Sequence, residues 1–112
     1  MTAKELLHRI PEVFDAGAMA EELGREDAVV QYDISEPVYH VLQDRTLAAF
    51  DGQADGPDVT IRVSDEDLIA LMKGDLNPMA AFMTGKLKVK GDVMLAQKLV
   101  SRVDRRRLAE LL

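Results

Sequence analysis

DVTIRVSDEDLIALMKGDLNPMAAFMTGKLKVKGD, residues 58–92, is the stretch that decides the fold. Over 59–63, apolar residues alternate with polar ones, which is typical of a strand with one buried face. Ser64 follows directly, and its hydroxyl suits a helix N-cap, while the acidic residues 65–67 complement the helix dipole. The next apolar side chains recur at helical spacing and form the expected buried stripe, Leu68, Leu71 and Met72. The stretch therefore predicts a strand that leads directly into a capped helix.

A second helix and a further strand complete the same stretch. Asn77 and Pro78 are typical of a helix start, and Gly85 is typical of a helix end. The letters KLKVKG, residues 86–91, then alternate lysine with apolar residues and predict a strand whose lysines face water. Asp92 caps the last predicted helix. This helix is expected to carry Leu95, Leu99 and Val103, ahead of a short tail, RRLAELL.

Upstream, the sequence predicts helices first and strands afterwards. A helix over residues 2–15 is expected to break at Pro11, because an interior proline removes a backbone hydrogen bond. A short helix is expected within 16–24. Alternating apolar residues and tight connections then predict a three-stranded antiparallel meander, with strands within 27–35, 37–44 and 46–52. A loop rich in glycine and aspartate, residues 51–58, separates the meander from the stretch quoted above.

The order of these elements defines the fold class. A mainly antiparallel five-stranded sheet, with helices packed on one face, makes an α+β layer. The length of 112 residues predicts one domain, 1–112. No apolar run approaches the roughly 20 residues of a membrane span, and the charged, amphipathic start does not read as a secretory signal. Because the chain has no cysteine, we expect a reducing, cytoplasmic location.

Charge is distributed unevenly along the chain. Residues 1–85 hold 17 acidic and 6 basic side chains, a net charge of −11, whereas residues 86–107 hold 8 basic and 2 acidic side chains, a net charge of +6. The total of −6 argues against nucleic-acid binding, which depends on neutralising phosphates. The basic segment suggests transient contact with an anionic membrane, through Lys86, Lys88, Lys90, Arg105, Arg106 and Arg107. The alternative is a solvated surface whose lysines protect the edge of the sheet.

The sequence has few signs of catalysis or metal binding. His8 and His40 lack the spacing of a metal site, so they are interpreted as surface or hydrogen-bonded histidines. The acidic run SDED, residues 64–67, is explained by helix capping. We expect no catalytic residue, metal or cofactor. An enzyme that uses Asp33 or Tyr32 as its acid or base is the weakest alternative, because nothing arranges partners for either.

Methionine is concentrated in one part of the chain. Four of the six methionines lie within 23 residues, and these are Met72, Met79, Met83 and Met94. The flexible thioether side chain fills irregular space and adapts to variable partners. Two interpretations follow: ordinary filling of a core, or an apolar cavity that accepts flexible ligands.

Residues 57–99 resemble the lipid-transfer domains of the sterol carrier protein type 2 family. The segments that carry the resemblance are, in order, DVTIRVSDEDL, ALMKGDLNP, PMAAFMTGKLKVKGD and AQKL. The resemblance implies that the sheet and its helices enclose an apolar tunnel, and that the chain binds and transfers a lipid without catalysis. The implied ligand is a fatty acid, a fatty acyl-CoA or a sterol-like molecule. The chain ends in AELL, which departs from the peroxisomal targeting tripeptide of some members.

The apolar faces of the predicted elements, together with the resemblance, select ten residues for the wall of one continuous cavity. The selected residues are Val30, Tyr32, Phe50, Leu71, Met72, Met79, Phe82, Met83, Leu95 and Leu99. On the last strand, Leu87 and Val89 are expected to point into the same cavity. A volume of roughly several hundred Å³ favours ligand binding. A core filled to ordinary density favours the alternative, an interaction or oligomerisation module of the same fold.

Overall fold

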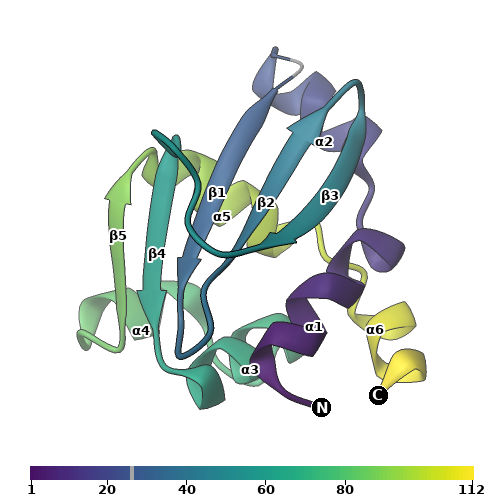
Figure 1. Cartoon of the computed structure of the whole chain (residues 1–112). Coiled ribbons are helices and arrows are strands. Elements are labelled where there is room, and N and C mark those ends of the chain that lie inside the picture. The colour runs from purple at the N-terminus through teal and green to yellow at the C-terminus, as the bar shows by residue number, and fades with distance from the viewer. Residues whose placement is uncertain (26) are drawn as a thin grey trace.

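Five strands form one sheet in the computed structural model, which describes residues 1–25 and 27–112 (Figure 1). The strands are β1 (Ala28–Asp33), β2 (Val38–Gln43), β3 (Thr46–Asp51), β4 (Val59–Val63) and β5 (Leu87–Gly91). Their order across the sheet is β3-β2-β1-β4-β5. Only β1 and β4 pair in parallel, so the mainly antiparallel sheet is confirmed.

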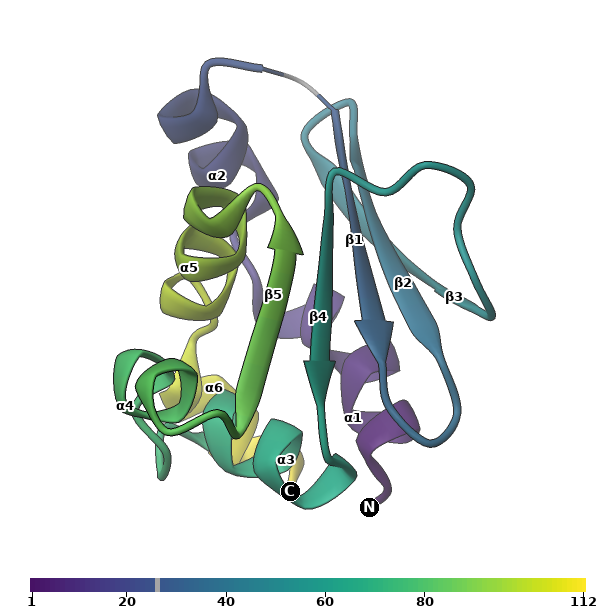
Figure 2. The same ribbon diagram turned by 90° about the vertical axis from the view of Figure 1, so that its left-hand side faces the viewer.

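The predicted meander of β1, β2 and β3 is also confirmed. Strands β2 and β3 are joined by the two residues Asp44 and Arg45, both with positive φ values, 52° and 63°. Such a two-residue turn matches the right-handed twist of a hairpin. After β3, the chain crosses to β4 through residues 52–58, which lie on the face of the sheet opposite α2 and α5 (Figure 2). The side chain of Gln31 fixes this crossover, because it accepts from the Ala54 N–H at 2.7 Å and donates to the Gly52 carbonyl at 3.1 Å.

The helices lie mainly against the other face of the sheet (Figure 2). They are α1 (Ala3–Arg9), the 3₁₀ helix η1 (Ile10–Val13), α2 (Ala16–Leu23), α3 (Asp65–Lys73), α4 (Pro78–Met83), α5 (Val93–Ser101) and α6 (Arg105–Leu111). The predicted break at Pro11 is the change from α1 to η1. The predicted caps also form: Ser64 accepts from the Asp67 N–H at 3.1 Å, and Asp92 accepts from the Leu95 N–H at 3.1 Å.

The C-terminal part differs from the prediction. Helix α5 ends at Ser101, so Val103 is not on it; Val103 pairs with Phe14 in an isolated antiparallel bridge. Asp104 then accepts from the Arg107 N–H at 3.1 Å and caps α6, so most of the predicted tail is helical. In the sequence, the apolar spacing of Leu95, Leu99 and Val103 looked like one continuous helix. The backbone contact between Val103 and the N-terminal segment interrupts it. Across the described residues, no helix combines the length and the apolar composition that a bilayer span requires.

Candidate functional site: an apolar cavity under the sheet

A cavity of about 140 Å³ lies between the inner face of the sheet and three helices, α3, α4 and α5. Strands β1, β4 and β5 form its floor, because alternate side chains of each strand point to the helical layer. Tyr32, Ile61 and Val89 are cross-strand neighbours on this floor, in the register that pairs β1 with β4 and β4 with β5. Leu87 also faces the cavity. Leu87 and Val89 therefore point into the cavity, as predicted.

Helix α3 supplies the fully buried part of the wall. Leu68, Leu71 and Met72 form the predicted stripe, and all three are buried. The capped N-terminus of α3 and its end at Gly74, which has a φ of 85°, fix the direction of this stripe. This part of the wall therefore belongs to the hydrophobic core as well as to the cavity.

Helices α4 and α5 supply the part of the wall that reaches the surface. Met79 and Phe82 line the cavity and are nevertheless 52% and 47% exposed. Val93, at the start of α5, is also exposed and also lines the cavity. The cavity therefore opens to solvent between α4 and the N-terminus of α5. Helix α4 has six residues, of which only Ala81 is buried, so few buried contacts hold this side of the opening.

The structure brings together five of the ten residues selected from the sequence: Tyr32, Leu71, Met72, Met79 and Phe82. Three others, Val30, Leu95 and Leu99, are buried around a separate void of about 10 Å³, which lies toward α2 and β3. The prediction of one continuous cavity is therefore wrong in its extent.

Phe50 and Met83 line neither space. Phe50 pairs with Tyr39 across β2 and β3, stacks on its ring at 5.4 Å between centroids, and lies on the outer face of the sheet. Met83 is 78% exposed at the end of α4, because its side chain points away from the cavity, whereas Met79 and Phe82 of the same helix line it.

Several lining residues were not selected from the sequence. Ile61 and Leu68 were assigned to buried faces without being assigned to the cavity, and the small residue Ala96 gave no signal of its own. The others are Pro78, Val93, Gln97 and Val100. The i, i+3, i+4, i+7 spacing from 93 to 100 carried the information, because it places one face of α5 toward the sheet.

One buried polar pair lies beside the cavity. The Tyr32 hydroxyl is 3.1 Å from Nδ1 of His40, and Nε2 of His40 is 2.8 Å from the Leu7 carbonyl oxygen. The carbonyl only accepts, so Nε2–H donates to it and Nδ1 accepts from the hydroxyl. Burial lowers the pKa of His40 from 6.5 to about 4, and burial raises the pKa of Tyr32 above its ordinary value. The pair is therefore neutral and fully hydrogen-bonded, as interpreted for His40.

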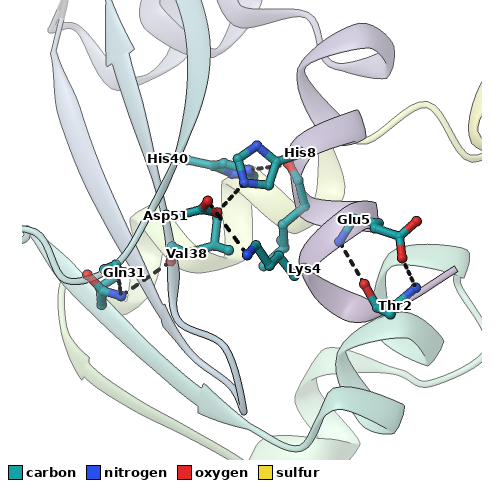
Figure 3. Close-up of polar contacts among 10 residues, drawn as sticks. Thr2, Lys4, Glu5, His8, Gln31, Val38, His40 and Asp51 are labelled. Atoms are coloured by element: carbon teal, nitrogen blue, oxygen red, sulfur yellow. Dashed lines mark hydrogen bonds and ion pairs between the residues drawn. The ribbon is translucent and has the colours of Figure 1, made fainter.

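The second histidine belongs to a surface cluster. Nε2 of His8 lies 2.6 Å from the Asp51 carboxylate, and Nζ of Lys4 lies 3.6 Å from it (Figure 3). The hydrogen bond from His8 and the charge of Lys4 lower the pKa of Asp51. Across residues 1–25 and 27–112, no three His, Cys, Asp or Glu side chains gather in a way that could hold a metal ion. Asp33, the other residue considered for acid–base work, accepts from Gln53 at 3.2 Å.

The basic segment does not form one surface. Lys86, Lys88 and Lys90 are exposed at β5, the edge strand beside α4. Helix α6, which carries the three arginines, lies on the opposite side of the molecule from β5 (Figure 1). Arg107 donates to the Glu12 carbonyl at 2.8 Å, and Arg105 lies across Gly74. The residues expected to contact an anionic membrane therefore lie on two separate parts of the surface.

The sheet and its helical layer thus form an α+β fold with an apolar cavity that is open to the surface. The chain belongs to the SCP-2 sterol transfer family, which it matches over residues 4–104. It is 36% identical over 98 residues to sterol carrier protein 2 of Rattus norvegicus, covering 88% of this chain and 16% of that protein. It is 35% identical over 99 residues to peroxisomal multifunctional enzyme type 2 of Mus musculus, covering 76% of this chain and 13% of that protein.

The chain thus spans less than a fifth of either of these relatives. One solved structure, in contrast, is matched over most of its own length as well as most of this chain. The solution structure of palmitated SCP2L2 from Aedes aegypti has a TM-score of 0.67 and 28% sequence identity, and the match covers 90% of this chain and 93% of that one. The family resemblance seen in residues 57–99 is confirmed.

Proposed function

We propose that this chain binds the apolar part of one lipid-type molecule in the cavity and carries it between apolar environments, without catalysing a reaction. The observation that supports the proposal is the cavity of about 140 Å³ itself. Among the residues that the structure describes, only Gln97 and Tyr32 add polar side chains to its lining. Membership of a sterol transfer family supports the same conclusion.

The lining limits which part of a ligand can enter. Because none of the described residues that line the cavity is charged, a carboxylate or phosphate inside it would lose hydration without gaining an ionic partner. A fatty acid, a fatty acyl-CoA or a sterol-like molecule would therefore place its apolar part inside and its polar group at the opening beside Met79 and Phe82. Each methylene transferred into the cavity gains about 0.8 kcal/mol.

Helix α4 is the element that we expect to move when a ligand enters. Ligand cavities commonly have volumes of roughly 300 Å³ or more, and about 140 Å³ is smaller than the several hundred expected from the sequence. A larger ligand therefore needs more space. Only Ala81 of α4 is buried, whereas α3 and α5 bury three and four residues. Moving α4 would therefore expose fewer buried residues than moving α3 or α5.

Lipid would reach the opening from a membrane surface. The exposed Lys86, Lys88 and Lys90 follow α4 directly in the chain, at or next to β5, whose alternate residues Leu87 and Val89 line the cavity. Basic side chains near an anionic bilayer contribute about 1 kcal/mol each, and the exposed Met79 and Phe82 could enter the interfacial layer. We therefore assign the proposed membrane contact to these lysines and not to the arginines of α6.

An interaction module is the second candidate. Two observations favour it. The volume of the cavity is smaller than that of most ligand sites, and Met83 and Met94 are exposed. In this case the apolar residues around the opening would contact another protein. Copurified lipid, sought by native mass spectrometry, distinguishes the two functions.

Filling the cavity tests the proposed function directly. Ala96 is buried and lines the cavity, so Ala96→Phe should place a ring in the space that the ligand needs. We expect this variant to stay folded and to lose at least tenfold in affinity for a fluorescent fatty acid. Ala48→Phe is the matched control, since Ala48 is exposed on the outer face of β3. Unchanged binding by a folded Ala96→Phe variant would contradict the proposal.

A further inference from the structure

One pair of contacting side chains reaches from one apolar space under the sheet to the other. Tyr32 lines the larger cavity, and His40 lines the void of about 10 Å³. Both spaces also lie against α5, which contributes Ala96 to the first and Leu99 to the second. The Tyr32–His40 pair, reaching from β1 to β2, therefore lies between them, and we call it the wall.

Hydrogen bonds and ring packing hold this wall in place. The Tyr32 hydroxyl donates to His40, and His40 donates to the backbone of Leu7, at 3.1 and 2.8 Å. The two rings meet edge to face, with centroids 4.9 Å apart and an interplanar angle of 73°. Neither side chain is exposed. If the Tyr32 ring moved away, Nδ1 of His40 would be left buried without a donor, which is unfavourable.

The wall lies at the inner end of a short cavity. Its opening is at Met79 and Phe82, which are exposed, whereas Tyr32 is completely buried. An apolar protein cavity of about 150 Å³ accommodates benzene, so about 140 Å³ holds about six carbon atoms. The void beyond the wall is too small to hold any further part of a ligand while the wall stays closed.

We propose that Tyr32, held by His40, determines ligand specificity by fixing the length of apolar chain that the cavity accepts. A straight chain enters past Met79 and Phe82 and ends against the Tyr32 ring. Carbon atoms beyond this length stay at the opening. This inference rests on the proposed function and adds to it the class of ligand, a single chain selected by length.

A break in the dependence of affinity on chain length follows from the wall. Each buried methylene contributes about 0.8 kcal/mol, which corresponds to about a fourfold gain in affinity. The gain should continue until the chain reaches Tyr32. Beyond that length, each added methylene stays partly in water, and the gain should fall well below twofold.

The experiment measures the affinity of a homologous series of straight-chain fatty acids, from butyrate to palmitate, by calorimetry below the concentration of micelle formation. The wild-type protein should show the break. Tyr32→Leu removes the ring and part of the wall, so the break should move to longer chains. Tyr32→Phe keeps the ring but removes the hydroxyl, so the break should stay at the wild-type length. Tyr39→Leu, the same change on the outer face of the sheet, should also leave it in place.

A second measurement uses the wild-type protein alone, in case Tyr32→Leu does not fold. The ¹⁵N shift of His40 Nδ1 reports whether it accepts the Tyr32 hydrogen bond. This shift should stay constant with short and long acids, because the chain stops at the wall. A change that appears only with long acids would overturn the inference, since it means that the chain displaces Tyr32.

The outcomes separate the two proposals. If no acid of any length binds, the proposed function fails. If acids bind but the affinity rises without a break up to palmitate, or the break is the same in Tyr32→Leu, then the function stands and the wall does not fix ligand length.

Discussion

Lowering the pH, even while it stays above the range in which carboxylates titrate, should destabilise this protein through one residue, His40. The buried imidazole loses its hydration, which is the main reason why its pKa falls from 6.5 to about 4, and the nearby His8 acts in the same direction. The hydrogen bond to the Leu7 carbonyl opposes the shift but is weaker. Between these two pH values the unfolded chain binds a proton that the folded protein does not bind. The stabilising effect is therefore complete above pH 6.5 and is lost as the pH falls toward 4.

The size of this effect follows from the two pKa values. A full pH unit inside the window is worth about 1.4 kcal/mol per proton. From about pH 7.5 to about pH 5, the difference between 6.5 and about 4 amounts to about 2 kcal/mol of unfolding free energy. The lowered pKa values of Asp51 and Glu5 act mainly below this range, because the ordinary values of these carboxyls are 3.8 and 4.5. Protonated His40 also has no acceptor for the Tyr32 hydroxyl.

Urea unfolding at both pH values, followed by circular dichroism, measures the effect. The wild-type unfolding free energy should be about 2 kcal/mol lower near pH 5 than near pH 7.5. His40→Gln should be less stable at neutral pH but should lose most of this difference. His8→Gln, which removes the exposed histidine, should retain the difference supplied by His40. Equal pH dependence in His40→Gln and the wild type would refute the reasoning.

Two other predictions concern the membrane contact and the backbone near the end of β5. Transfer of a fluorescent fatty acid to vesicles with anionic lipid should be several-fold faster than to neutral vesicles at low salt, and the advantage should shrink as salt rises. Lys88→Glu should remove much of this advantage while Arg106→Glu retains it; equal rates to both vesicle types would exclude the contact. Gly91→Ala should destabilise the fold by at least about 2 kcal/mol, because φ is 105° and a Cβ would lie 2.5 Å from the Asp58 carbonyl oxygen. A thermal melt unchanged from the wild type would contradict this.

The sequence predicted those elements whose local signals agree. In residues 58–74, strand alternation, the Ser64 cap and the stripe of α3 all point to one structure, and the structure confirms each of them. The C-terminal helix was different. The spacing of Leu95, Leu99 and Val103 suits one helix, but Val103 pairs with Phe14, almost ninety residues away in sequence. The cap residue Asp104 was visible in the sequence, and only the distant contact shows that it starts a separate helix.

At the candidate site, local sequence patterns likewise did not decide which face of a strand points to the helices. The strand TLAAFD has apolar residues on both faces, so its alternation does not decide whether Phe50 or Ala49 points inward. The register with β2 decides it, because His40 faces the helices and pairs with Ala49. Phe50 therefore lies on the outer face. Tyr32 and Met72 line the cavity, and their placement could be read from the sequence because their elements have one clearly apolar face.

Although the volume of the cavity is small, the fact that it is not filled by side chains argues for binding over a filled module. By the dependence measured for closed apolar cavities, about 24 cal/mol per Å³, a space of about 140 Å³ reduces stability by at most about 3 kcal/mol relative to a filled core, and by less here because the cavity is open to solvent at α4. Domains are stable by only about 5–15 kcal/mol, so this is a substantial fraction. A single larger side chain at Ala96 would fill much of the space. The void beyond Tyr32 and His40 has a volume of only about 10 Å³. A void confined to one side of a hydrogen-bonded wall, and open at α4, is the arrangement expected when the missing part of the core is a ligand.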